Sequence, residues 1–153
     1  MIRFFLLAWA LIGSFWVANS AEAQTGSREL AFSSTSYDNG FVEILIASTG
    51  DVNVTWTLDP FRKPKPAKQP WKRRVGLSLK KTKQIFQTLD ASGFAKMKNG
   101  RDQRPDEPSV TIKESRDGKE LHAITYPAGE LPKELSELLS QLDAIYQKAD
   151  SDR

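Results

Sequence analysis

Two neighbouring segments of this chain, residues 41–47 and 52–58, carry large apolar residues at every second position, and in the second segment polar residues alternate with them. This alternation is typical of β-strands, and Thr49-Gly50-Asp51 between them predicts a hairpin turn. A three-residue loop keeps the apolar side chains on one face, whereas a two-residue loop places them on opposite faces. We therefore predict a loop at 49–51, with Ile46 opposite Val54, Ile44 opposite Trp56 and Val42 opposite Leu58.

A second hairpin is predicted from residues 109–115 and 119–126, which flank Asp117-Gly118. This dipeptide strongly favours a two-residue turn. Such a turn sets Val110 and Ile112 beside Thr125 and Ala123 and leaves Ile124 and Tyr126 on the other side. The pattern therefore does not decide which face of this hairpin is buried.

Two further segments have the spacing of amphipathic helices. The first begins after Ser78, a suitable N-cap, and ends near Ala91, with Gly93 as a C-cap. The second spans about Pro132 to Lys148, and proline suits a first helical turn because its missing N–H is not needed there. The order predicts an α+β fold, in which two antiparallel hairpins form one sheet with two helices packed on one face.

The N-terminus is typical of an export signal. Residues 4–21 carry no charge, and Ala21-Glu22-Ala23 places small residues where a signal peptidase cleaves, before Gln24. The alternative is an uncleaved membrane anchor, because the uncharged run just reaches the length that spans a bilayer. We expect a periplasmic or extracellular protein, anchored in the membrane only if the signal is uncleaved.

These signals divide the chain into four parts. We predict a signal peptide over residues 1–23, an N-terminal segment over 24–35 with a short strand near 29–34, one α+β domain over 36–148, and a tail over 149–153. The chain has no cysteine, so disulfides, thiol catalysis and thiolate metal sites are excluded. The hydrophobic core alone must stabilise the domain.

Candidate catalytic and metal-binding residues are few. His122 is the only histidine, and neither a serine-hydrolase nor a zinc-peptidase motif surrounds it, so we interpret it as a structural or surface residue. The acidic residues Asp102, Asp106 and Glu107 alternate with arginines and lack the glycine of a calcium loop. We predict no cofactor and no enzymatic activity, with an uncharacterised hydrolase as the least favoured alternative.

Basic residues are concentrated in residues 61–83. This window holds ten of the 22 Lys and Arg residues and none of the 19 Asp and Glu residues, although the net charge of the chain is only +3. The remainder of the chain is therefore acidic overall. Four prolines between residues 60 and 70 predict an extended, exposed loop over residues 59–76, in which Val75 and Leu77 can form a short strand.

Aromatic residues lie among these charges, and rings beside Lys and Arg are typical of surfaces that bind polyanions or single-stranded nucleic acid. The alternative is a loop whose charges only keep an exposed edge soluble. We predict an exported binding protein whose ligand is an anionic polymer, a membrane surface or an acidic protein. The predicted ligand-binding residues are Phe61, Arg62, Lys63, Lys65, Lys68, Trp71, Lys72, Arg73 and Arg74.

The turn and cap motifs resemble a known family. In order they are Asn39-Gly40-Phe41, Leu77-Ser78-Leu79, Gly93-Phe94, Val110-Thr111-Ile112 and Asp117-Gly118. Over residues 36–146 this order is similar to the small emfourin-like proteins, which include proteinaceous inhibitors of thermolysin-type metallopeptidases and exported relatives of unassigned activity. The resemblance implies the same architecture and, as an alternative function, inhibition of a thermolysin-like peptidase through an inserted hairpin loop.

The chain departs from the family pattern in two places. The family usually has Gly-Gly-Phe followed by Gly where this chain has Asn39-Gly40-Phe41-Val42. The basic window is also longer than the link that such proteins have at this position. The resemblance therefore transfers the architecture, and no inhibitory residue is assigned from it.

Overall fold

The computed structural model describes residues 26–37, 40–58, 69–104 and 107–151. The predicted signal peptide lies outside the described residues. So do Asp106 and the first five predicted ligand-binding residues, Phe61, Arg62, Lys63, Lys65 and Lys68.

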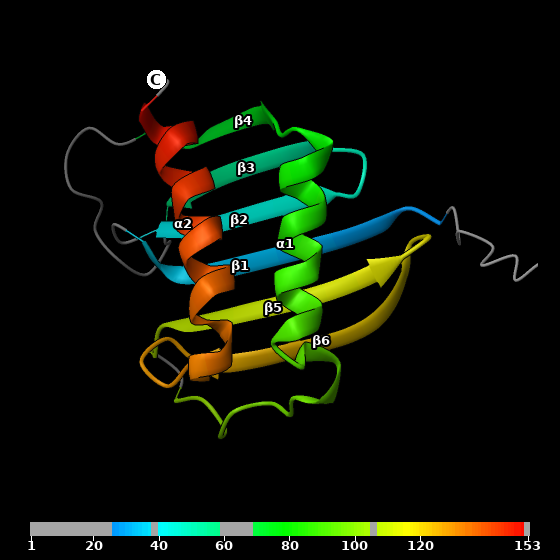
Figure 1. The fold of residues 1–153 in the computed structure, drawn as a ribbon. Coiled ribbons are helices and arrows are strands. Elements are labelled where there is room, and N and C mark those ends of the chain that lie inside the picture. The colour runs from blue at the N-terminus through cyan, green and yellow to red at the C-terminus, as the bar shows by residue number, and fades with distance from the viewer. Residues whose placement is uncertain (1–25, 38–39, 59–68, 105–106, 152–153) are drawn as a thin grey trace, which may run out of the picture.

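The fold is one six-stranded antiparallel sheet with two helices on one face (Figure 1). The spatial order of the strands is β4-β3-β2-β1-β5-β6. Their bounds are β1 Arg28–Tyr37, β2 Gly40–Ala47, β3 Asp51–Leu58, β4 Trp71–Gly76, β5 Ser109–Arg116 and β6 Lys119–Pro127. The helices are α1 Leu79–Ala91 and α2 Ser136–Ser151, with short 3₁₀ helices η1 Phe94–Lys96 and η2 Lys133–Leu135.

The α+β class is confirmed, but the predicted sheet of two hairpins was wrong. The short strand predicted near residues 29–34 is part of β1. β1 pairs with β2 on one side and with β5 on the other, so the segment that was set apart from the domain is a central strand that joins the two hairpins. Its Leu30 and Phe32 are 0% and 2% exposed. A strand buried on one face needs an apolar residue only at every second position, which explains how so polar a segment holds the middle of the sheet.

β4 is the second strand that the predicted sheet lacked. Residues 71–76 were assigned to the exposed basic loop, yet they pair with β3 along their whole length. Val75 is 7% exposed and belongs to the core. The prolines that predicted a loop all precede this strand, so they do not interrupt its pairing.

The first hairpin turns one residue earlier than predicted. Ile46 pairs with Val52 and Ile44 with Val54, so the loop is residues 48–50. Gly50 has a φ of 96°, and its N–H donates to the Ala47 carbonyl at 3.0 Å. Glycine adopts this conformation without steric cost, and its position therefore sets where the loop ends. The register shifts by two residues, which keeps the predicted apolar face on the core side.

The second hairpin turns at Asp117 and Gly118 as predicted, with φ of 52° and 74°. A β-bulge next to Glu114 then shifts the register by one residue. Ile112 consequently pairs with Ile124, and Val110 with Tyr126. The separation of these apolar residues onto two faces was wrong, because the bulge brings them onto the face that the helices cover.

Both helices lie near their predicted positions. Ser78 caps α1, since its Oγ accepts a hydrogen bond from the Lys81 N–H at 3.3 Å. The second helix begins with the 3₁₀ turn η2 after Pro132 and continues through Ala149, which is 0% exposed. The predicted tail from residue 149 was therefore wrong for residues 149–151, which are helical.

The core lies between the sheet and the two helices. Its largest fully buried side chains are Trp56, Phe94, Leu30, Ile44, Ile46, Ile85, Leu89, Ile112, Ile124, Leu135, Leu138 and Leu142. No helix within the described ranges is long and apolar enough to cross a membrane. The two outer strands, β4 and β6, form the opposite edges of the sheet (Figure 1).

Candidate ligand-binding surface

β4 brings four of the predicted ligand-binding residues to one edge of the sheet. The strand has the sequence Trp-Lys-Arg-Arg-Val-Gly from residue 71 to residue 76. Its register sets Arg73 opposite Val54, on the side of the sheet that faces the helices. Lys72 and Arg74 are opposite Thr55 and Asn53, so their side chains project from the other side.

Trp71 packs this edge of the sheet against α2. Its ring stacks on that of Tyr146, with 6.0 Å between the ring centroids and 26° between the ring planes. The side chain is half-buried and packs against the core. One face of the indole is therefore occupied within the domain, and β4 is held in a defined position beneath α2.

The next element, α1, carries three lysines in its first turns. Only Leu77 and Ser78 separate β4 from α1, whose first turns lie at the β4 side of the sheet (Figure 1). We call the combined surface the basic edge, defined by Lys72, Arg73, Arg74, Lys80, Lys81 and Lys83. The lysines of α1 belong to the basic window in the sequence, but they were not among the predicted site residues.

Arg74 is the one residue of the basic edge with a carboxylate partner within the described part of the chain. Its Nε donates to Asp51 Oδ1 at 3.2 Å, and its terminal NH₂ also contacts this oxygen. Arg74, with a further hydrogen bond from Thr49, holds the pKa of Asp51 below its usual value. Both side chains are exposed, so solvent screens the pair.

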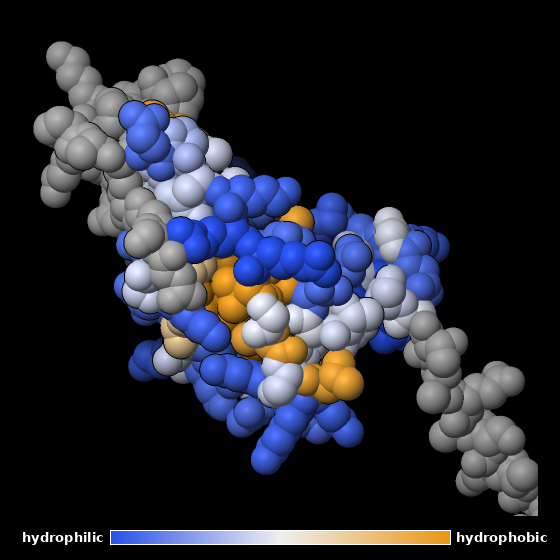
Figure 2. Space-filling model, turned by 90° about the horizontal axis from the view of Figure 1, so that it is seen from above, coloured by the Kyte–Doolittle hydropathy of each residue, from blue (hydrophilic) through white to orange (hydrophobic). Residues whose placement is uncertain are grey.

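The basic edge also exposes apolar surface. Figure 2 looks at the molecule from the β4 side and shows an apolar area surrounded by hydrophilic side chains. A shallow, open hollow here is lined by Trp71, Lys72, Arg73 and Arg74. A ligand at this surface meets cationic groups and apolar contacts together.

The lysines of α1 oppose the electrostatics of their own helix. The N-terminus of a helix carries a partial positive charge, which acidic residues stabilise and basic residues destabilise. The first turn of α1 contains no acidic residue and includes Lys80 and Lys81. Departures from a stabilising pattern are expected mainly at functional sites, so this arrangement favours a role in binding anions.

His122 lies in the packing of the domain, remote from the basic edge. Its Nε2 is 2.9 Å from the Met97 carbonyl oxygen, and its ring meets Phe94 edge-on with 4.9 Å between centroids. It pairs across the strands with Glu114, which is 7% exposed. The histidine therefore has structural contacts on both sides.

Glu114 belongs to a cluster that sequence reasoning missed. Arg28 Nε donates to Glu114 Oε1 at 2.6 Å, and Arg28 NH1 donates to Asp90 Oδ2 at 3.0 Å. Asp90 and Glu114 together raise the pKa of Arg28 above its usual range. The three residues are far apart in the sequence and form no motif, so no local signal could have identified them.

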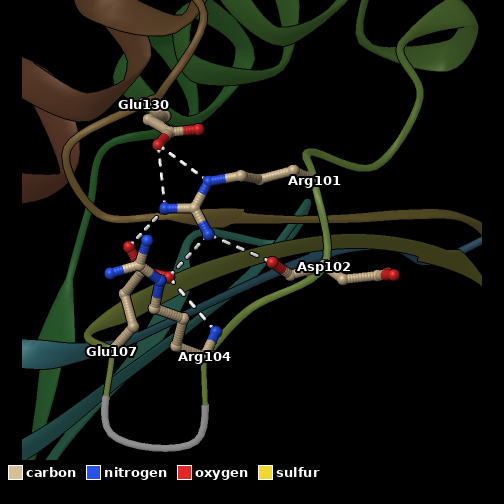
Figure 3. A network of polar contacts seen from close by, with 5 residues as sticks. All are labelled: Arg101, Asp102, Arg104, Glu107 and Glu130. Atoms are coloured by element: carbon tan, nitrogen blue, oxygen red, sulfur yellow. Dashed lines mark hydrogen bonds and ion pairs between the residues drawn. The ribbon is translucent and has the colours of Figure 1, made fainter.

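In the loop that follows Gly100, Arg101 binds two glutamates (Figure 3). Arg101 donates to Glu107 Oε2 at 2.9 Å and to Glu130 Oε1 at 3.0 Å, and also to the Asp102 carbonyl. Arg101 and the Arg104 N–H hold the pKa of Glu107 below its usual value. Within the described residues no group of three His, Asp or Glu side chains is placed to hold a metal ion.

No protein-family model matches the chain, and no curated protein matches it either. The resemblance to the emfourin-like proteins therefore stays a prediction.

Proposed function

We propose that this chain is a non-enzymatic binding protein that holds an anionic ligand at its basic edge. The observation that supports this is that two consecutive elements, β4 and α1, carry five cations without a carboxylate partner in the described part of the chain: Lys72, Arg73, Lys80, Lys81 and Lys83. Surface lysines and arginines that serve only solubility are usually interspersed with acidic residues.

The structure of the edge suits a ligand with several negative charges. The cations come from two rigid elements, β4 and the first turns of α1, so their backbone positions are set before binding. Neutralising several charges of a polyanion releases its counterions, which makes binding depend strongly on salt. A protein exported as the N-terminus predicts would meet such ligands as acidic polymers, membrane surfaces or acidic proteins.

A salt series tests the proposal. Binding of the protein without its signal peptide is measured to a heparin-like polymer, to single-stranded DNA and to vesicles that contain anionic lipid. We expect at least one to bind, with affinity falling about a hundredfold or more between ~50 and ~200 mM salt, because about five cations contribute. A shallow salt dependence, or no binding to any acidic partner, would contradict the proposal.

A further inference from the structure

The two edges of the sheet differ in how they are covered. At the β6 edge the Gly100 N–H donates to the Thr125 carbonyl at 2.9 Å, and the Thr125 N–H donates to Asn99 Oδ1 at 3.0 Å. At the other edge β3 is the one ladder partner that β4 has among the described residues. An uncovered edge presents N–H and C=O groups with which another chain can pair.

The register identifies which groups of β4 face outward. The Leu77 N–H donates to the Gly50 carbonyl at 3.0 Å, one position beyond the pairing of Gly76 with Asp51. Opposite residues in an antiparallel ladder alternate between hydrogen-bonded and non-hydrogen-bonded pairs. Lys72, Arg74 and Gly76 therefore direct their N–H and C=O groups away from β3, whereas Arg73 directs its groups toward it.

The exposed face of β4 has room for side chains at the end of the strand. A Cβ built on Gly76 meets no heavy atom within 4 Å. Lys72 and Arg74 are exposed as well, and they alternate with Arg73 along the strand. Three outward-facing backbone positions in succession are enough to pair with a short strand of another chain.

The side chains of β4 determine which residue types would suit a strand that pairs with it. On the exposed side of the sheet it would run past Lys72 and Arg74, where opposite charges across strands are favourable. On the helix side it would pass Trp71, Arg73 and Val75, of which Trp71 and Val75 pack against or belong to the core. The complementary strand alternates acidic with apolar residues, because strand side chains alternate between faces.

We propose that an extended acidic segment of a partner protein adds to β4 as a further strand, hydrogen-bonded to the backbone of Lys72, Arg74 and Gly76. Strand addition is a common mode of peptide recognition, in which the backbone supplies affinity and alternate side chains supply specificity. This inference rests on the proposed function, since the same cations attract the ligand, and it assigns the ligand to polypeptide.

Three synthetic peptides of equal composition and charge test the inference. The first alternates glutamate and valine over the length of β4, the second has the same residues in two blocks, and the third is the first with N-methyl groups at alternate residues. We expect the alternating peptide to bind at least about threefold more tightly than either control, because only it can form the ladder and match both faces.

Two variants of Lys72 separate backbone pairing from charge. Lys72→Ala and Lys72→Pro remove the same charge, but only proline also removes the outward N–H, while the bonds to β3 stay intact. We expect Lys72→Pro to bind the alternating peptide about three to ten times more weakly than Lys72→Ala. Urea unfolding shows whether both variants are folded.

Amide hydrogen exchange in the wild-type protein gives an answer that needs no variant. The alternating peptide should protect the amides of Lys72, Arg74 and Gly76, whereas the Arg73 amide should be protected already without it. Equal binding of all three peptides with no added protection would overturn strand addition and leave the proposed function standing. If neither the peptides nor the anionic ligands of the salt series bind, both proposals fail.

Discussion

Arg28 joins three elements of the fold through one side chain. Its guanidinium contacts Glu114 of β5 and Asp90 of α1, and lies over the Phe86 ring with 4.8 Å to the ring centroid. The Arg28 side chain is 18% exposed and that of Glu114 is 9% exposed, so this pair is mostly buried. A buried charge that loses its partner is strongly destabilising.

We expect Arg28→Ala to lower the free energy of unfolding by about 2–4 kcal/mol, because it leaves the Glu114 carboxylate buried without its cation. Urea denaturation at neutral pH measures this change. Asp90→Ala is the matched control, since the Asp90 side chain is 60% exposed and its loss should cost about 1 kcal/mol or less. Equal effects of the two variants would show that Glu114 does not depend on Arg28.

Individual residues with strong backbone preferences could be assigned from the sequence. Ser78 caps α1, and Asp117 and Gly118 form the turn of the second hairpin, because these roles depend on the residue and its immediate neighbours. The contact of Arg28 with Glu114 could not be predicted, because it depends on which strands become neighbours. To predict this contact, one would first have to know that β1 lies beside β5 in the sheet.

For a whole strand, the alternation of side chains predicts which face is buried better than it predicts which residues pair across a hairpin. In the first hairpin a shift of two residues leaves every apolar side chain on the same face, so the pattern could not place the loop at 48–50. In the second hairpin, a single bulge next to Glu114 shifts the pairing by one residue, so the apolar side chains of the two strands share one face. Bulges leave no consistent trace in an apolar pattern.

The strands β1 and β4 could not be assigned to the sheet from composition alone. Each has few apolar residues, because each buries one face only, and β4 is also preceded by four prolines. Composition therefore favoured a terminal segment and a loop. Pairing with neighbours that are already strands stabilises both, and this contribution comes from tertiary structure, not local sequence.

α1 allows a prediction in which stability and binding change in opposite directions. Lys81 lies three residues after the N-cap Ser78, whose Oγ accepts its N–H. Lys81→Glu would place an acid at the position that completes a capping box and favours the helix dipole. We expect a gain of about 0.5–1 kcal/mol in the free energy of unfolding, measured in urea, together with weaker binding of anionic ligands.

Lys81→Ala is the control for this change, because it removes the charge without supplying a capping carboxylate. It should weaken anion binding less than Lys81→Glu and stabilise the helix less. If Lys81→Glu binds anionic ligands as well as the wild type, the start of α1 does not belong to the binding surface.

The whole molecule is asymmetric in charge and in the cover of its sheet. The basic edge lies along β4 and the start of α1, whereas the β6 edge is covered by residues 97–100. The sequence predicted a loop over residues 59–76 followed by a helix after Ser78, and the fold replaces the described end of that loop with the strand β4. The basic residues lie on neighbouring elements because α1 follows β4 directly.

A matched pair of double variants tests where on the protein the anionic ligand binds. Lys72→Ala/Arg73→Ala removes two cations from the basic edge, and Lys96→Ala/Lys98→Ala removes two exposed cations beside the β6 edge. Each variant loses two positive charges, so the two variants have equal net charge, and surface changes of this kind alter stability by only about 0.5 kcal/mol. Any difference in binding then reports position, not total charge.

The decisive measurement is the affinity of each double variant for the ligand that binds most tightly in the salt series, at one low salt concentration. We predict a loss of about tenfold or more for Lys72→Ala/Arg73→Ala, with binding by Lys96→Ala/Lys98→Ala close to that of the wild type. Equal losses in the two variants would contradict a defined site at the basic edge and would show that the protein binds through its overall charge.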